Sequence, residues 1–287
     1  MIFESVNVKY EVINLTDEFE EYAVYLCRCG NVKYTICCLK SEKLKKRICP
    51  LLIKMQEIAG YDDLVDIFTD RNDICAVFRY DECGTTFNEV CDDESLSLGK
   101  KLDIVYRFCS DLCIRNIPFY MAADMLKNSN VGVRNDGRIG FCYRLCEMEQ
   151  YADSDMTEFC RIFGGIIQKL FKAEKREFEI DEIDKFADGI INDTPADYIE
   201  LFGRFQRVYT ELCDKINSGK LKSRNKGVRI WSRLKVIVPM LKNFVIGALL
   251  ILACFILART LFTDKNSDKE TIKSIGSIIV EENIDSK

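Results

Sequence analysis

The sequence contains no histidine in its 287 residues, and this absence removes several kinds of chemistry. A Ser–His or Cys–His catalytic pair needs imidazole as its base, and many metal sites need it as a ligand. Hydrophobic residues make up 48% of the chain and aromatic residues 11%, which is the composition of a folded protein rather than a disordered one. The sequence therefore predicts a folded protein without histidine-based catalysis or histidine-ligated metal.

Cysteine is abundant, but the pattern lacks the features of a secreted disulfide framework. The fifteen cysteines are odd in number and lie mostly in apolar runs. Free cysteine behaves as a small core hydrophobe, and this usage is typical of a reducing compartment. One alternative is a zinc site in which Cys27 and Cys29 face Cys37 and Cys38 across a hairpin. The usual Cys-x-x-Cys spacing is missing, so we expect no metal and no cofactor.

Charge is strongly segregated along the chain. Residues 1–218 hold 28 Lys and Arg against 40 Asp and Glu, a net charge of −12. Residues 219–242 hold eight basic residues and no acidic one, whereas 259–287 is close to neutral. An acidic body of this kind argues against nucleic acid as the main partner.

The first third of the chain reads as strands around one helix. Val, Ile, Tyr and Cys are concentrated in three runs, and apolar residues then recur at helical spacing up to Gly60. Two further apolar runs follow. The pattern predicts strands over 10–13, 22–28 and 32–39, a helix over 44–59, and strands over 64–68 and 74–80.

The following two thirds read mainly as amphipathic helices. Apolar residues three and four apart predict helices over 97–115, 155–171, 183–191 and 194–212. Asp155 stands where an acid caps a helix start. Between the first two of these helices, residues 131–141 alternate around Asn135, Asp136 and Gly137, which is strong turn chemistry, and so predict a hairpin.

The segment Ala123–Leu145 resembles the catalytic segment of protein kinases. In that family a His-Arg-Asp-Leu-Lys-x-x-Asn loop leads through a hairpin into Asp-Phe-Gly. Leu126, Lys127 and Asn130 fall on matching positions. The order of the predicted strands and helix before this segment is also that of a kinase amino-terminal lobe. The resemblance implies a kinase-like fold.

The same alignment implies that the kinase chemistry is lost. Met125 stands in place of the catalytic base, Tyr143 in place of the metal carboxylate, and Cys37 in place of the strand lysine. The strand turn over 15–22 has no glycine and four acids, which would repel triphosphate. We therefore expect a pseudokinase without catalytic residues.

Two observations leave an enzyme open as the alternative. Lys127 and Asn130 survive from the kinase pattern. Asp124 is a candidate for a relocated base, and Asp136 or Asp155 for a relocated metal ligand. On this reading the chain is a divergent membrane-tethered kinase, or a signalling regulator that still binds nucleotide.

The stretch from 243 to 258 has no charged residue, and Lys242 and Arg259 flank it. With 259–262 added it reaches about the 20 residues that span a bilayer. The excess of Lys and Arg before it places the amino-terminal part in the cytoplasm and the tail outside. The basic segment before the span would also attract anionic lipid. The alternative is a buried globular helix.

The sequence therefore predicts an α+β fold, a two-lobed kinase-like domain followed by one transmembrane helix. The predicted parts are an N-lobe, a helical C-lobe, a basic juxtamembrane segment, the transmembrane helix and a short outer tail (1–82, 83–218, 219–242, 243–262 and 263–287). The layout resembles the EssB/YukC component of bacterial type VII secretion. This resemblance implies an inactive single-pass scaffold of the cell membrane. Its expected partners are membrane lipid, other proteins of the membrane complex and a second copy of the chain.

Overall fold

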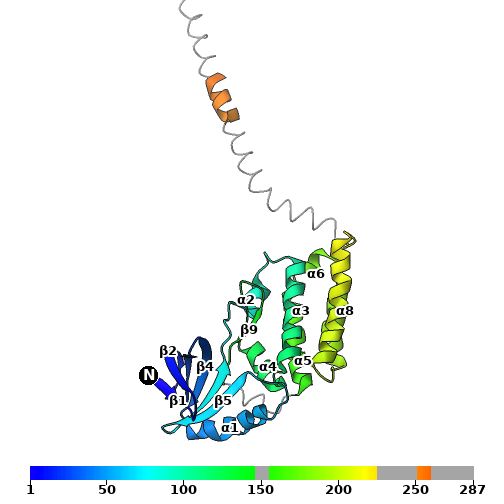
Figure 1. The fold of residues 1–287 in the computed structure, drawn as a ribbon. Coiled ribbons are helices and arrows are strands. Elements are labelled where there is room, and N and C mark those ends of the chain that lie inside the picture. The colour runs from blue at the N-terminus through cyan, green and yellow to red at the C-terminus, as the bar shows by residue number, and fades with distance from the viewer. Residues whose placement is uncertain (146–154, 225–250, 260–287) are drawn as a thin grey trace, which may run out of the picture. The chain divides into compact units, whose positions relative to one another are not determined.

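The computed structural model describes residues 1–145, 155–224 and 251–259. Residues 1–225 form one compact unit, and residues 226–287 form a second. The first unit is drawn from blue to yellow in Figure 1.

The amino-terminal part is a six-stranded antiparallel sheet in the order β1-β2-β3-β4-β6-β5. Successive residues of a strand point to opposite faces. In β4, Ile36 and Cys38 are buried on one face while Cys37 and Leu39 are buried on the other, so this strand is covered on both sides. The strands are β1 (Ile2–Glu4), β2 (Lys9–Glu18), β3 (Tyr22–Cys29), β4 (Val32–Leu39), β5 (Leu64–Asp70) and β6 (Asp73–Arg79).

The sheet curls into a half-barrel that brings its two edges together. Ser5, which follows β1, donates a hydrogen bond of 2.6 Å to Asp66 of β5. Two register shifts bend β2 between Val12 and Asp17, as bulges do. The inner side of the curl holds a small core of aromatic, aliphatic and thiol side chains: Phe3, Tyr10, Cys27, Ile36, Cys38, Phe68, Cys75 and Val77.

Helix α1 (Glu42–Gln56) covers the outer face of the curled sheet. Ser41 caps its first turn by accepting a hydrogen bond from the Leu44 amide. The buried side chains recur at helical spacing: Leu44, Ile48, Leu51, Leu52 and Met55. They join the same cluster as Cys37 and Phe78 of the sheet. Burial of this apolar stripe, rather than intrinsic propensity, holds the helix in place.

A short connector leads from β6 to the helical part. It contains β7 (Thr85–Thr86) and α2 (Phe87–Asp92), and Thr86 and Glu89 form a capping box. β7 pairs with β8 (Val131–Val133), which pairs in turn with β9 (Ile139–Phe141). The connector and the hairpin thus share a second, three-stranded sheet.

The helical part is built from α3 (Leu98–Arg115), α4 (Phe119–Lys127), α5 (Met156–Leu170), α6 (Glu174–Glu177), α7 (Asp181–Asn192) and α8 (Tyr198–Asn217). Helix α3 packs on α8, and α5 packs on both α4 and α7. The chain after α8 returns along α6, where Ser223 bridges Phe178.

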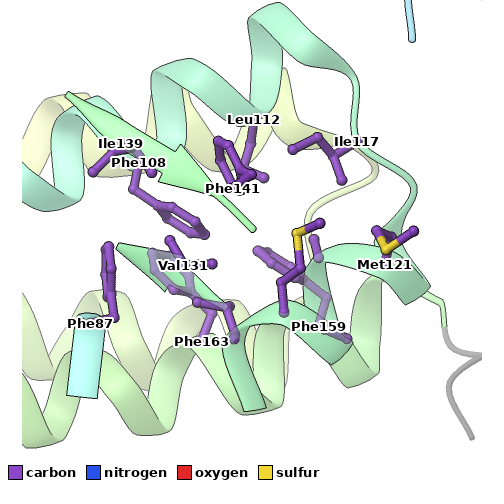
Figure 2. Packing of buried hydrophobic residues seen from close by; sticks show 14 of the residues in the cluster. Phe87, Phe108, Leu112, Ile117, Met121, Val131, Ile139, Phe141, Phe159 and Phe163 are labelled. Atoms are coloured by element: carbon purple, nitrogen blue, oxygen red, sulfur yellow. The ribbon is translucent and has the colours of Figure 1, made fainter. Parts of the chain in front are cut away.

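One hydrophobic core runs through the helical part and continues under the sheet. Figure 2 shows its centre, where Phe108 of α3 lies among Phe87, Phe141 and Phe163 from three other elements. Their side chains are almost completely buried. The same cluster reaches Val24 in β3 and Leu212 in α8, so the sheet and the helices fold around shared packing.

Most predicted elements are confirmed, with shifted ends. Strands β3 to β6, helices α1, α3, α5, α7 and α8, and the 131–141 hairpin lie where the patterns indicated. The predicted 10–13 strand is longer, because it extends to Glu18 through its two bulges. Helix α8 begins at Tyr198 with Asp197 as its cap, rather than at Thr194. The elements β1, β7, α2, α4 and α6 were not anticipated.

The predicted fold class needs correction. The fold is α+β, with a curled antiparallel half-barrel sheet, and this architecture is not diagnostic of a two-lobed kinase-like domain. Among the residues described, no helix combines the length and apolar character needed to cross a membrane. The expected transmembrane helix over 243–262 is therefore wrong for this structure.

Only part of that segment falls within the described residues. Residues 251–259 form a helix of nine residues with exposed side chains, whereas a span takes about 20 helical residues. Residues 243–250 and 260–262 lie outside the described residues, as does the predicted tail over 263–287. The basic segment 219–242 is described only as far as Arg224.

Two neighbouring glycines of α5 test the packing of α5 on α7. A Cβ at Gly165 would meet nothing, so Gly165→Ala should stabilise the protein by about 0.5–1 kcal/mol through helix propensity. A Cβ at Gly164 would lie 2.9 Å from Ile191 Cδ1 and 3.2 Å from the Ala187 carbonyl oxygen. Gly164→Ala should therefore destabilise by about 1 kcal/mol or more. Urea unfolding of both variants checks this, and equal effects would contradict the described packing.

Candidate functional site

The five positions that align with kinase motifs, of which only Lys127 and Asn130 keep the kinase residue, lie around the junction of the sheet and the helices. Cys37 lies in β4, Met125 and Lys127 in α4, Asn130 just before β8, and Tyr143 just after β9. All are buried except Lys127. The structure brings Cys37 and Tyr143 into contact, because the Cys37 thiol donates to the Tyr143 carbonyl oxygen at 3.6 Å.

Met125 and Asn130 form a second group beside the hairpin. The Asn130 amide donates to the Met125 carbonyl oxygen, and the Asn130 carbonyl oxygen accepts from the Cys142 amide, both at 2.8 Å. Ser129 adopts a positive φ of 58° at this bend. Asn130 therefore fixes the start of the hairpin through its backbone hydrogen bonds. This structural role accounts for the residue without a catalytic one.

The segment before the hairpin is helical, whereas the kinase resemblance implies a loop at this position. Residues Ala123 to Lys127 are the last turn and a half of α4. Ala122, Ala123, Met125 and Leu126 are good helix formers and are buried. Asp124 is also fully buried, and its Oδ1 accepts a hydrogen bond of 2.8 Å from the Asn128 side chain. The helix propensity of these residues alone predicts a helix here. The kinase resemblance favoured a loop instead.

Tyr143 fills the junction between the sheet and the helices. Its ring stacks on Phe78 of β6, with ring centroids 4.6 Å apart and planes 7° from parallel. Its hydroxyl donates to the Asp63 carboxylate, and burial raises the pKa of the phenol well above 10. Tyr143 is thus a neutral hydrogen-bond donor where the kinase pattern expects a metal-binding carboxylate, and it has no group that would hold a cation.

Arg115, at the end of α3, joins the carboxylates of this junction. Its Nη1 donates to Asp63 at 3.1 Å and also to Asp81, and its guanidinium lies 5.0 Å from the centre of the Phe141 ring. The Asp81 carboxylate also accepts from the Phe141 amide at 3.3 Å. Burial alone lowers the pKa of Arg115. The Asp81 hydrogen bond and the negative charges of Asp63 and Asp81 outweigh this effect, so the pKa lies above its usual value.

The connector lies directly on the hairpin, with no space between their backbones. A Cβ at Gly140 would fall 2.5 Å from the Glu82 carbonyl oxygen, and one at Gly84 would fall 2.4 Å from the Val133 carbonyl oxygen. A Cβ at Gly132 would lie 3.1 Å from the Cys83 Cβ. Glycine is required at these contacts because any side chain would separate the two segments.

A disulfide joins the same two segments, between Cys83 of the connector and Cys142 after β9. This departs from the expectation that the cysteines form no disulfide, although twelve others in the described residues are not disulfide-bonded. The two cysteines are 59 residues apart in the chain, so their pairing depends on the packing of connector on hairpin. No spacing in the sequence signalled it.

The zinc alternative is not supported by the strand register. Cys27 lies opposite Tyr34 and Cys29 opposite Val32, so neither faces Cys37 or Cys38. Cys37 and Cys38 also point to opposite faces of β4. In the described part of the chain, no three His, Cys, Asp or Glu side chains gather as metal ligands.

The remaining sequence-predicted positions lie away from this junction. Arg259 ends the short helix over 251–259, and Lys242 lies outside the described residues. Asp136 is a turn residue whose Oδ1 accepts from the Arg138 amide, and Asp155 caps α5. Neither Asp136 nor Asp155 belongs to the Arg115 network. Sequence reasoning missed this network because its members come from four separate stretches of the chain.

Removing the Arg115 charge tests how strongly the junction depends on it. Arg115→Met leaves two largely buried carboxylates without their cation, and we expect the free energy of unfolding to fall by about 3 kcal/mol. The control is Arg107→Met on the same helix, where an exposed side chain donates to the Asp136 carbonyl oxygen. It should cost less than about 1 kcal/mol. Denaturant unfolding measures both, and similar losses would refute a special role for Arg115.

The chain was compared with known protein families and with curated proteins. Neither comparison finds a match. What the junction does must therefore be inferred from its residues and their contacts.

Proposed function

We propose that this protein is a catalytically inactive scaffold that works through protein contacts, with a pseudokinase-like body as its structural base. The observation that carries the proposal is the filled junction around Tyr143. Phosphoryl transfer needs a cation-binding carboxylate, a lysine and backbone room for phosphates. Here a neutral tyrosine, a buried thiol at Cys37 and a closed connector occupy the corresponding positions.

The packing of connector on hairpin supports the same proposal. A bound nucleotide base would need a gap between these segments, whereas the Gly140 and Gly84 contacts place backbone against backbone. The Cys83–Cys142 disulfide holds them together. A junction of this kind suits a rigid body that presents surfaces, rather than an enzyme that opens and closes around a substrate.

The order of elements supports the kinase-like part of the proposal. Strands β2, β3 and β4, then α1, β5 and β6, are followed by a connector, α3 and the 131–141 hairpin. The sequence resemblance to kinases predicts this order. A role like that of the EssB/YukC component in building a secretion complex is the specific form of the proposal, and its partners would be proteins of that complex.

Exposed apolar side chains on β2 offer one place for such contacts. Ile13 and Leu15 lie on this strand beyond its pairing with β1, and Phe19 follows it; each is between 43% and 49% exposed. Scattered apolar residues are normal on a surface. Three along one strand end favour a partner at this position.

Titration with ATP and magnesium tests the absence of nucleotide binding. A ligand present at 100 times its Kd would add about 2.7 kcal/mol of stability. We expect the melting temperature to stay unchanged, because the junction is filled. A clear rise that Lys127→Ala or Asn130→Ala abolishes would overturn the scaffold proposal and favour the divergent kinase.

Crosslinking in cells followed by pull-down tests the assembly role. We expect the full chain to recover components of a secretion complex, including its ATPase. The change Ile13→Glu with Leu15→Glu should reduce this recovery, while Ile114→Glu, on an exposed α3 residue, serves as the control. Recovery of no complex component would count against the secretion role. Equal recovery by both variants would count against the β2 contact.

A further inference from the structure

Helix α1 carries a basic face that the proposed function does not use. The exposed members are Lys43, Lys46, Arg47 and Lys54 on the helix and Arg71 at the β5–β6 turn. Glu42 is the single acid within α1. The buried stripe of α1 fixes which way this face points, because Leu44, Ile48 and Met55 hold the opposite side against the sheet.

The structure holds Arg71 beside the amino-terminal half of α1. Lys45 is nearly buried, and its ammonium group donates both to the Asn72 carbonyl oxygen and to Glu42. This contact ties the β5–β6 turn to the helix. Between them lies a hollow of about 430 Å³, whose lining includes Lys46, Arg71 and the acid Glu42, which Lys45 already pairs. Two cations therefore border a space large enough for one phosphate-bearing headgroup.

The charge of this face contrasts with that of its surroundings. Residues 1–218 carry a net charge of −12, and many of their surface cations pair with acids, as Lys9 does with Glu4 and Lys215 with Glu182. No ion pair is found for Lys43, Lys46, Lys54 or Arg71 within the described ranges. Their charge is available to a ligand, while the rest of the body repels an anionic surface.

We propose that this basic face of α1 docks on an anionic phospholipid surface. Figure 1 shows α1 along the outside of the sheet, with no other element beyond it in that view. A helix side of this shape can meet a flat surface. Ile53, which is 55% exposed, and Pro50 stand on the same side and can enter the headgroup region. Each basic residue near such a surface contributes about fivefold to binding.

The geometry favours lipid over an acidic polypeptide. A bound peptide gains affinity from a groove or a free strand edge that orders its backbone. The outward side of α1 has no strand edge, and the hollow beside it borders only the first two turns of the helix. The charges of Lys43, Lys46 and Lys54 instead follow the helix over three turns, which spreads them across several headgroups rather than concentrating them on one carboxylate.

Vesicle sedimentation of the full chain tests the proposal. The probes are vesicles of phosphatidylcholine alone and of phosphatidylcholine mixed with phosphatidylserine. The test variant carries Lys43→Gln, Lys46→Gln and Arg71→Gln. The matched control carries Lys100→Gln, Lys172→Gln and Arg176→Gln, which removes the same charge from exposed positions in the helical part. Both keep the basic segment 219–242, so its contribution cancels.

We expect the test variant to bind mixed vesicles about 100-fold more weakly than the unaltered chain, as three lost charges predict. The control should bind as the unaltered chain does. All six positions are exposed, so we expect both variants to keep the fold. Circular dichroism melting checks this. Equal binding by the two variants overturns the proposal. Loss of binding to polyglutamate in the test variant, without vesicle binding by the unaltered chain, assigns the face to an acidic protein and also overturns it.

Discussion

The guanidinium of Arg115 is the point on which the arrangement of this protein depends. It ends α3, yet it reaches one carboxylate before β5 and another after β6. Tyr143, from beyond β9, donates to the first of these carboxylates. Four stretches of chain that are far apart in sequence are thereby held by one positive charge. Desolvation makes such a group costly unless it is fully paired. Here the helical part supplies the cation, and the carboxylates that pair with it flank two strands of the sheet.

The consequence is a body that behaves as one piece. The main hydrophobic cluster passes from the sheet through the junction into the helices without interruption. The connector adds backbone contacts at glycines and a covalent bond to the hairpin. Domains joined by a small polar interface move relative to each other as a rule. A continuous apolar core with a paired charge at its centre opposes such movement.

The sequence predicts the periodic elements of this fold well and its junction poorly. Strands such as β4 and helices such as α3 carry long patterns, and caps such as Asp155 behave as expected. Short elements carry little periodic signal, so β1, β7 and α2 were missed. Helix α4 was missed for another reason: the kinase likeness of its residues competed with their helix propensity. The Arg115 network and the disulfide depend on tertiary contacts, which no single stretch encodes.

Strand β4 shows what the two-sided burial of the sheet demands of its sequence. The neighbouring residues Cys37 and Cys38 belong to different cores, one shared with the helices and one enclosed by the curled sheet. Substitution of either residue alters one core alone. Insertion of a single residue would exchange the two sets of side chains along the strand. The length of this strand is therefore under tighter constraint than the identity of any residue in it.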